Sequence, residues 1–365
     1  MNIAIVMPRF TSFGRARATS IDLCVRDLVE YSRHRHSIRV ICDKVEEPFP
    51  GISVEQISDG GFGGPMAKAW RTASLILQKP TDLVIVQQHL PTAFVIAKRL
   101  RLPVLYHTHN FQKRPTSRLK RALRSWRYAP LAGMVMVSDA CIKQFNLDWP
   151  DISLPTAAVN NGLDMEIWRP ETSRAKEILI VGRAAPEKGV LEAVRAAAEV
   201  LRQFPEWKVR CILSESVRHP DYFVLIKETA SAFPEQMTIM QNQTYDVVKQ
   251  AYERAAIAMV LSRWDEPFGR TALEAHAGGA ALISSGTGGL AEISGPSAII
   301  VDPDDHARVV DALSLLASDD ELRIRLACEG RARVASRFDI RNVASSLDDF
   351  CETITEVKRR RTTLA

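Results

Sequence analysis

Short apolar runs alternate along this chain with longer segments in which apolar residues recur at helical spacing. Such runs, bounded by turn residues, are typical of buried strands. The predicted strands are residues 2–7, 38–42, 82–86, 103–107, 134–137, 157–159, 178–182, 209–213, 237–240, 256–261, 280–284 and 298–301. Helices are predicted between several of them, the first one capped by Thr19 or Ser20. Strand, loop and helix repeated in this order indicate a parallel sheet, so we expect an α/β fold.

The pattern falls into two series, separated by a polar segment at residues 167–176 that is the best candidate for a linker. A chain of 365 residues is also too long for one typical core. We therefore expect one domain at residues 1–165, a second at 166–335, and helices in residues 336–365 that cross back to the first. The Gly- and Pro-rich residues 48–65 are expected to be mostly loop, and the basic C-terminal tail is expected to fray.

Composition narrows the class of protein without naming a function. The chain is 46% hydrophobic and 25% charged, which is ordinary for a globular protein. No apolar run approaches the ~20 residues of a membrane span, and the N-terminus is not a signal peptide. Six scattered cysteines have no metal-ligand or redox spacing. We expect a cytoplasmic protein whose cysteines are buried small residues.

Charge is unevenly distributed between the two halves. Residues 1–164 carry 22 Lys and Arg against 13 Asp and Glu, whereas the remainder carries 26 against 30. The basic first half invites an anionic partner, such as a membrane surface, a nucleic acid or a phosphorylated substrate.

Much of this positive charge lies in residues 113–127, which contain seven basic residues and no acidic one. Leu119, Ala122, Leu123 and Trp126 recur there at helical spacing. A basic amphipathic helix is typical of segments that lie on anionic membranes, so we expect peripheral contact with the inner membrane face. The alternative is a surface helix whose apolar stripe packs on its own domain while the basic side chains are solvated.

Two carboxylates surround one strand-loop-helix turn in the second half. Glu266 follows the predicted strand 256–261, and Glu274 falls in the first turn of a helix beginning near Thr271. Loops at the carboxyl ends of parallel strands face the ligand crevice, and a helix N-terminus there offers N–H groups. Alternatively, Thr271 and Glu274 have the spacing of a capping box, which would make Glu274 structural.

The loop after strand 178–182 places Arg183 and Lys188 before another helix, which is a good cradle for phosphate; solvated loop charges are the alternative. It is not a Walker loop. His109 ends a strand, where it could face a crevice or merely close the strand. The three glycines in residues 285–292 either let backbone approach a ligand or form an ordinary turn.

These motifs together resemble those of GT-B glycosyltransferases of the retaining family 4 type, most strongly from residue 157 to residue 305. The motifs are Asn161-Gly162-Leu163-Asp164, Val181-Gly182-Arg183 with Lys188-Gly189, Glu266-Pro267-Phe268-Gly269 with Glu274-Ala275, and Gly288-Gly289 with Glu292. The resemblance implies two Rossmann-like domains facing a cleft, with a C-terminal helix crossing back to the first domain.

The resemblance also implies roles for particular residues. Arg183 and Lys188 would hold the diphosphate of a nucleotide-sugar donor, Glu274 would bind the ribose hydroxyls, and Glu266 would contact the donor sugar. A growing charge on the leaving diphosphate is stabilised by fixed cations and helix N–H groups, so no metal or other cofactor is expected.

Further donor contacts follow from the same resemblance. The backbone N–H groups of Phe268, Gly269 and Arg270 would assist Glu266. His109 matches the family's histidine near the donor sugar, and Gly14 matches its first-loop glycine near the diphosphate. The family usually has a glycine pair in that loop, and this sequence has one.

A second departure from the family lies after Glu274. His276 and Gly279-Ala280-Ala281 replace the more usual Met and Gly-x-Pro. We expect these replacements to alter packing only.

The expected activity is transfer of a sugar from a UDP- or GDP-sugar to a glycan or glycolipid, with retention, in lipopolysaccharide or cell-surface polysaccharide biosynthesis. Retention in this family requires no second carboxylate as nucleophile, unlike retaining hydrolases. No nucleic acid partner is expected. The alternatives are a sugar-nucleotide epimerase of the same fold and a non-catalytic glycan-binding subunit.

Overall fold

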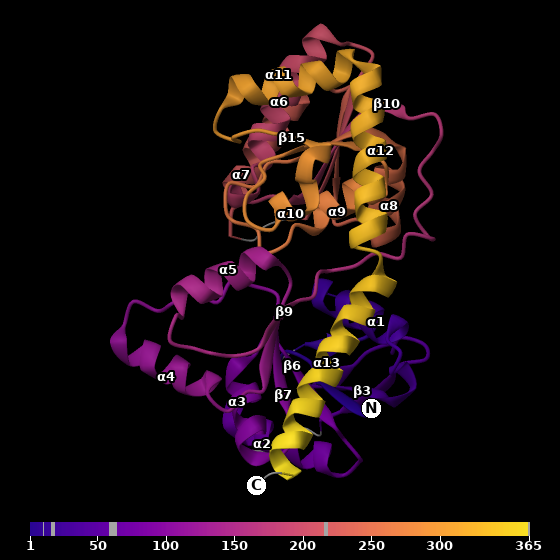
Figure 1. The fold of residues 1–365 in the computed structure, drawn as a ribbon. Helices are drawn as coiled ribbons and strands as arrows, with labels where there is room; N and C mark the ends of the chain where they lie inside the picture. Colours follow the sequence, from indigo (N-terminus) through magenta and orange to yellow (C-terminus); the bar gives the residue numbers. More distant parts are fainter. Residues whose placement is uncertain (10, 16–18, 58–63, 215–217, 364–365) are drawn as a thin grey trace. The chain divides into compact units, whose positions relative to one another are not determined.

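The chain divides into two compact units, which are described separately (Figure 1). The computed structural model describes residues 1–9, 11–15, 19–57, 64–214 and 218–363. The first unit comprises Met1–Gly162 and Ile340–Ala365, and the second comprises Leu163–Asp339. The C-terminal helix therefore returns to the first unit, as the sequence predicted.

The first unit is built on a parallel sheet with the strand order β5-β3-β1-β6-β7-β8-β9. Its strands are β1 (Ile3–Val6), β3 (Ile38–Cys42), β5 (Ser53–Gln56), β6 (Leu83–Gln87), β7 (Val104–Thr108), β8 (Gly133–Met136) and β9 (Thr156–Ala158). Two short strands, β2 (Ser12–Phe13) and β4 (Lys44–Val45), pair beside it. The helices are α1 (Ser20–Tyr31), α2 (Pro65–Leu77), α3 (Leu90–Arg99), α4 (Arg118–Tyr128), α5 (Asp139–Asp148) and α13 (Ile340–Thr363), with a 3₁₀ turn at Arg35–Ser37.

The second unit repeats the architecture with the parallel strand order β12-β11-β10-β13-β14-β15. Its strands are β10 (Ala175–Arg183), β11 (Lys208–Ser214), β12 (Met237–Gln241), β13 (Ala255–Val260), β14 (Ala281–Ser284) and β15 (Ala298–Ile300). Its helices are α6 (Val190–Gln203), α7 (Pro220–Ser231), α8 (Tyr245–Arg254), α9 (Arg270–Ala277), α10 (Leu290–Ser294), α11 (His306–Ser318) and α12 (Asp320–Arg337), with 3₁₀ turns at Pro186–Lys188 and Gly295–Ser297. The predicted α/β class with parallel sheets is confirmed.

Burial of the central strands explains the apolar runs. All four residues of β1 and all six of β13 are buried, because helices cover both faces of a parallel sheet. At the start of α1, Thr19 accepts from the Asp22 N–H and Asp22 accepts from the Thr19 N–H, which completes a capping box. Each unit has its own apolar core, so each sheet is a separate scaffold for side chains at its carboxyl edge.

Two of three segments differ from the sequence-based expectation. The described part of residues 48–65 is mostly loop, as expected, and contains the short strand β5, which pairs with β3; residues 58–63 lie outside the described part of the chain. The expected linker at residues 167–176 packs within the second unit, where Trp168 is buried and the Arg174 guanidinium donates to backbone carbonyls. The basic residues 358–361, which were expected to fray, belong to α13, which continues to Thr363.

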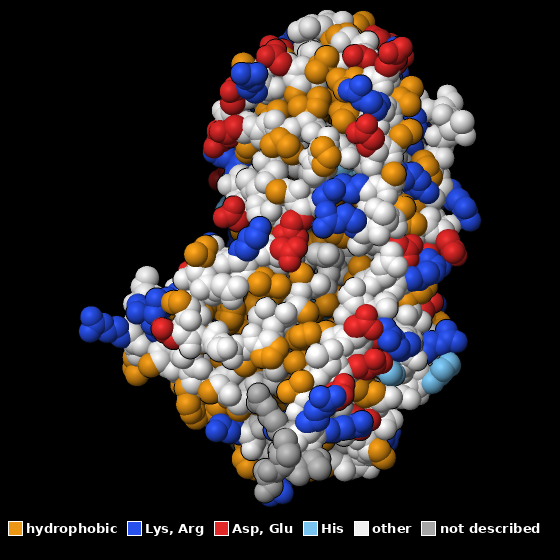
Figure 2. Space-filling model, in the orientation of Figure 1, with side chains coloured by type: hydrophobic (Ala, Val, Ile, Leu, Met, Phe, Trp, Pro, Cys, Tyr) orange, Lys and Arg blue, Asp and Glu red, His pale blue; other side chains and the backbone are white. Residues whose placement is uncertain are grey.

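Helix α4 presents its apolar face outward. Leu119 is 80% exposed and Trp126 is 54% exposed, although the Trp126 ring also packs on Phe94 with centroids 4.1 Å apart. Figure 2 shows hydrophobic and basic side chains side by side on the edge of the first unit where α4 lies. The alternative in which the apolar stripe packs on its own domain therefore holds in part for Trp126 and does not hold for Leu119. Within the described residues, no helix is long and apolar enough to cross a membrane.

Candidate functional site

A small cavity of about 180 Å³ lies at the carboxyl ends of β10 and β13 in the second unit. It is lined by Ile180, Val181, Gly182, Arg183, Lys188, Gly189, Val190, Ala193, Met259, Val260, Leu261, Ser262 and Thr271. The phosphate-cradle residues predicted from the sequence and the first turn of α9 therefore border the same space. This is the edge of the sheet at which ligands bind in open α/β folds.

Gly189 shapes one wall of this cavity. It adopts φ +62° at the start of α6, and a Cβ added there would lie 1.8 Å from the carbonyl oxygen of Leu261. Any larger residue would push the start of α6 away from the end of β13. The close approach leaves the N-terminus of α6, with the positive end of its dipole, at the cavity.

The two predicted cations have different surroundings. The Arg183 side chain is 49% exposed, and its guanidinium pairs with Glu187 at 3.0 Å. The Lys188 ammonium lies 2.5 Å from Glu266 Oε1 and 5.5 Å from the centroid of the Trp264 ring. Both cations can reach an anion in the cavity, and each now has a carboxylate partner that such an anion could replace.

Glu266 is buried, with 7% of its surface exposed, and one oxygen takes several donors. Its Oε1 accepts hydrogen bonds from Lys188 Nζ, from Ser262 Oγ at 2.6 Å and from Trp264 Nε1 at 3.1 Å. A charged side chain held in this way has one fixed orientation. Glu266 does not line the cavity itself and connects to it through Lys188 and Ser262.

Glu274 is also buried, and its partner is on its own helix. The Arg270 Nε donates to Glu274 Oε1 at 2.7 Å. Burial raises the pKa of the Glu274 carboxyl, and the Arg270 charge opposes that shift. Burial therefore disfavours the charged form of this carboxyl group, whereas the ion pair with Arg270 favours it.

The alternative assignment of Glu274 to a capping box is wrong. Helix α9 begins at Arg270 after Gly269, which has φ +106°, and in the described structure no side chain caps it. Thr271 consequently lies inside the helix, where it cannot act as the capping residue. The backbone N–H groups of Phe268, Gly269 and Arg270 are at this N-terminus, where N–H groups have no partner within the helix.

The glycine-rich turn before α10 supports the Glu266 loop. A Cβ on Gly288 would lie 2.4 Å from the Glu266 carbonyl oxygen, and one on Gly289 would lie 2.6 Å from Phe268 Cα. The Gly289 N–H donates to the Glu266 carbonyl at 2.7 Å. Gly288 and Gly289 allow the two loops to pack closely against each other. Packing of the turn, and not close approach to a ligand, is therefore sufficient to explain these two glycines.

His109 follows β7 directly in the first unit and is held by two glutamines that the sequence analysis missed. Its Nε2 lies 3.0 Å from Gln87 Oε1, and its backbone N–H donates to Gln88 Oε1 at 3.0 Å. Gln87 Nε2 lies 3.2 Å from Nδ1 of His107, whose ring stacks on that of His109. Because an amide oxygen only accepts, His109 Nε2 carries the proton and its Nδ1 is left as an acceptor. Burial lowers the pKa of His109 to about 4, so the ring is neutral near neutral pH.

A signal for these glutamines was available in the sequence. Gln87 and Gln88 directly follow the predicted strand 82–86, and His107 and His109 are at the end of the next one. The carboxyl ends of parallel strands meet at one edge. Two amides facing two imidazoles at that edge form a polar network.

Gly14 lies in the first unit where the chain passes the segment after β4. A Cβ there would lie 1.7 Å from the Glu46 carbonyl oxygen, and the neighbouring Arg15 N–H donates to the Glu47 carbonyl at 2.8 Å. Packing within the unit is therefore sufficient to require glycine at this position. Its assignment to the donor diphosphate stays a prediction.

His276 takes part in packing on the far side of α9. It is fully buried, and its two ring nitrogens have no hydrogen-bond partner in the described structure. A Cβ on Gly330 of α12 would lie 2.0 Å from His276 Nδ1, so the glycine makes room for the ring. Burial, followed by the Arg333 charge, lowers the pKa of His276 to about 4.

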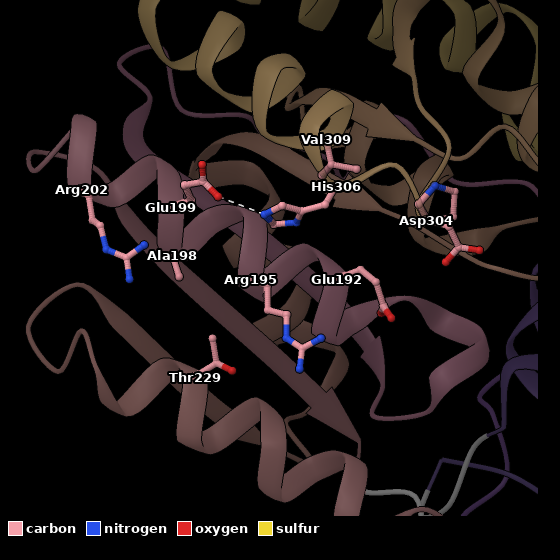
Figure 3. A pocket seen from close by; sticks show the side chains of 10 residues that line it. Glu192, Arg195, Ala198, Glu199, Arg202, Thr229, Asp304, His306 and Val309 are labelled. Carbon is pink, nitrogen blue, oxygen red and sulfur yellow. Dashed lines mark hydrogen bonds and ion pairs between the residues drawn. The ribbon is translucent and has the colours of Figure 1, made fainter.

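A larger hollow of about 560 Å³ lies elsewhere on the second unit, between α6, α7 and the start of α11 (Figure 3). Its charged side chains include Arg195, Arg202 and the exposed pair of His306 and Glu199, whose atoms are 3.0 Å apart. It contains none of the predicted site residues. We therefore assign the candidate site to the smaller cavity, where cations, a helix N-terminus and a strand end converge. Among the described residues, no group of three His, Cys, Asp or Glu side chains is placed to hold a metal ion.

Comparison with known proteins identifies a family for most of the second unit. Residues 165–333 match the family model described as "Glycosyl transferases group 1". A glycogen synthase of Mycobacterium tuberculosis is 31% identical over 244 residues, which are 63% of this chain and 56% of that protein. A D-inositol 3-phosphate glycosyltransferase of Corynebacterium urealyticum is 26% identical over 60% of this chain and 56% of that protein. The chain spans about half the length of the curated relatives it matches.

Solved structures share the fold over nearly the whole chain. The Anabaena Alr3699/HepE structure in complex with UDP has a TM-score of 0.79 at 15% identity, covering 97% of this chain and 100% of that one. The sucrose-phosphate synthase of Thermosynechococcus elongatus has a TM-score of 0.75 at 17% identity, covering 98% and 100%. At such identities the likeness extends to the fold alone.

Proposed function

Because this chain belongs to the glycosyl transferases group 1 family and has the GT-B fold, we propose that it transfers a sugar from a nucleoside-diphospho-sugar to a glycan or glycolipid. The observation that carries this proposal is the cavity of the second unit. Arg183, Lys188 and the start of α6 border it on one side, and the first turn of α9 borders it on the other. A diphosphate requires cations and N–H donors arranged in this way.

Leaving-group stabilisation is the chemical task of this cavity. As the sugar–phosphate bond breaks, charge grows on the diphosphate, and fixed cations stabilise it more than they stabilise the bound donor. Lys188 would exchange Glu266 for a phosphate oxygen, or share its N–H groups between the two. Glu266 would then face the donor sugar as a hydrogen-bond acceptor, with the N–H groups of Phe268, Gly269 and Arg270 beside it.

Glu274 is proposed to accept hydrogen bonds from the ribose hydroxyls. A carboxylate is acceptor-only and can receive two neighbouring hydroxyl groups. Its ion pair with Arg270 favours the charged form despite burial. The proposed roles of His109 and Gly14 near the donor rest on the family resemblance alone.

Retention and independence of metals remain part of the proposal. The leaving phosphate would accept the proton of the acceptor hydroxyl on the same face of the sugar, so a carboxylate nucleophile is unnecessary.

The names of similar proteins suggest donors and acceptors to test: UDP with Alr3699/HepE, and glycogen or inositol phosphate with the two curated relatives. Cell-surface glycolipid synthesis is favoured by the exposed basic and apolar face of α4, which we propose rests on an anionic membrane.

A donor screen tests the proposal. Purified protein is heated with UDP, GDP and their sugar conjugates, and a ligand that binds only the folded state raises the melting temperature. We expect one nucleotide series to stabilise the protein, and Lys188→Ala to remove the effect. Product anomers resolved by NMR then report retention. If none of these nucleotides raises the melting temperature, the protein does not have the proposed donor site.

A further inference from the structure

A second cavity lies in the first unit, between the first turns of α4 and the segment that follows α5. Its volume is about 220 Å³. It is lined by Arg114, Arg118, Arg121, Ala122, Ser125, Trp149, Asp151 and Ile152. None of these residues belongs to the donor site, so a ligand bound here is distinct from the donor; Arg118 and Arg121 lie on α4, for which membrane contact is proposed above.

Positive charge dominates the lining of this cavity. The lining residues include three arginines and one acidic residue, Asp151. Among the described residues, Arg114, Arg118 and Arg121 are in no ion pair. In the second unit's site, by contrast, Arg183 and Arg270 are each paired with a glutamate. The cavity therefore concentrates uncompensated positive charge.

One donor in the cavity wall lacks an acceptor. Arg121 Nε is buried and has no hydrogen-bond partner among the described residues, and elsewhere on its guanidinium Nη2 donates a long 3.4 Å hydrogen bond to the Thr116 carbonyl. A buried donor without an acceptor is destabilising, so native structures rarely keep one unless a ligand or water satisfies it. An acceptor oxygen placed in the cavity would supply that partner.

The remaining walls suit an ester of phosphate. The Trp149 indole N–H donates to the Gln112 carbonyl at 2.7 Å, which fixes the ring against the cavity. Ala122 and Ile152 add apolar surface, and the Ser125 hydroxyl adds one polar contact. A phosphate has several oxygens that match the fork of a guanidinium, and its ester group can lie on the apolar wall.

From these contacts, we infer that this cavity binds a phosphate group carried by a lipid headgroup or a soluble phosphate ester. Arg121 and Arg118 hold the phosphate oxygens, with the positive end of the α4 dipole close by. Leu119 and Leu123, on the same helix, are exposed and could enter the acyl region while the headgroup occupies the cavity.

Binding of soluble and vesicle probes tests the inference on the intact chain. Calorimetry measures inorganic phosphate and glycerol 3-phosphate, and co-sedimentation measures phosphatidylcholine vesicles containing phosphatidic acid or, at equal surface charge, phosphatidylserine. Arg121→Gln and Arg118→Gln remove cavity cations. Lys120→Gln and Arg127→Gln remove the same charge from α4 outside the cavity and are the matched controls.

We expect saturable binding of glycerol 3-phosphate that weakens about tenfold or more in Arg121→Gln and Arg118→Gln, as for a lost charge-assisted hydrogen bond. The controls should change it about twofold or less, because Lys120 is exposed and neither Lys120 nor Arg127 lines the cavity. Preference for phosphatidic acid over phosphatidylserine, lost in the cavity variants, identifies a lipid source. Soluble binding without that preference identifies a soluble ester.

Two results would overturn the inference. One is the absence of saturable binding of either soluble probe together with no vesicle preference. The other is equal weakening by all four variants, which would mean that the helix acts only through its net charge. Arg118 is exposed, so its variant tests the site even where Arg121→Gln fails to fold.

Discussion

Individual residues of the candidate site are held by interactions that a donor would have to replace. Lys188 donates to Glu266, Arg183 pairs with Glu187, and Glu274 accepts from Arg270. Such pairs keep the side chains ordered before a ligand arrives, which lowers the entropy lost on binding. The residues recognised in the sequence thus take part in three separate ion pairs of the second unit.

Sequence reasoning placed these residues correctly on loops and helix starts but could not supply their partners. Glu274 looked like half of a capping box because Thr271 has the right spacing. The positive φ of Gly269 allows the loop to end two residues earlier than that spacing assumes, and α9 begins at Arg270. Gln87 was missed because its importance arises from pairing with β7, which is distant in the chain.

The buried, unpartnered His276 predicts a stability that depends on pH. Its pKa in the folded state, about 4, is below the unfolded value near 6.5, so the unfolded chain binds more protons between these values. Stability from this residue is complete above pH 6.5 and is lost as pH falls toward 4. His276→Met should therefore flatten the pH dependence, by about 3 kcal/mol across that range.

Urea unfolding of both proteins at several pH values measures this effect. His36→Gln, which removes an exposed histidine, is the control. Its free energy of unfolding should change with pH as that of the wild type does. Parallel curves for wild type and His276→Met would show that His276 does not carry the acid sensitivity.

Gln87 predicts the tautomer of His109. Its amide oxygen accepts from His109 Nε2, so the neutral ring keeps a free electron pair on Nδ1. Long-range ¹H–¹⁵N correlation should show the Nε2–H tautomer in the wild type and a mixture in Gln87→Leu, with turnover about tenfold lower from the lost hydrogen bond. Gln78→Leu, at an exposed position after α2, should change neither quantity. An Nδ1–H tautomer in the wild type would rule this arrangement out.

At the scale of elements, glycines decide where loops meet. Gly189 brings α6 against β13, and Gly288 and Gly289 bring two loops of the second unit together. The sequence predicted the strands and helices from their apolar periodicity. It did not predict β5 within residues 48–65, because that edge strand has few apolar residues and depends on pairing with β3.

Helix α4 predicts a membrane-facing surface that can be tested by removing its apolar side chains. Leu119 and Leu123 are exposed, and transfer of each to a membrane contributes about 1.5–3 kcal/mol. Leu119→Ser with Leu123→Ser should lower retention on anionic vesicles by about tenfold or more. Ile324→Ser, which changes an exposed residue of α12, is the control. If the double variant is retained on the vesicles as well as the wild type is, α4 is a solvated surface helix and does not bind the membrane through these leucines.

At the scale of the whole molecule, the chain consists of two α/β units, each with its own core and parallel sheet. The order of motifs along the chain was sufficient to predict this fold. The exact limits of the two units and the helical C-terminus were harder to predict from the sequence. They depend on contacts between distant residues, such as Asp348 of α13, which accepts from Ser32 Oγ and the Arg33 N–H after α1.

The central claim is that the cavity of the second unit binds a nucleoside-diphospho-sugar and stabilises its leaving diphosphate. The most direct measurement is the rate of nucleoside diphosphate release from UDP- and GDP-sugars, with and without acceptor, by the wild type, Lys188→Ala and the surface control Lys176→Ala. We predict release by the wild type and the control, and a rate about 10²–10³ lower for Lys188→Ala, as for a lost oxyanion donor. Release that is unaffected by Lys188→Ala, or no release from any donor, would contradict the claim.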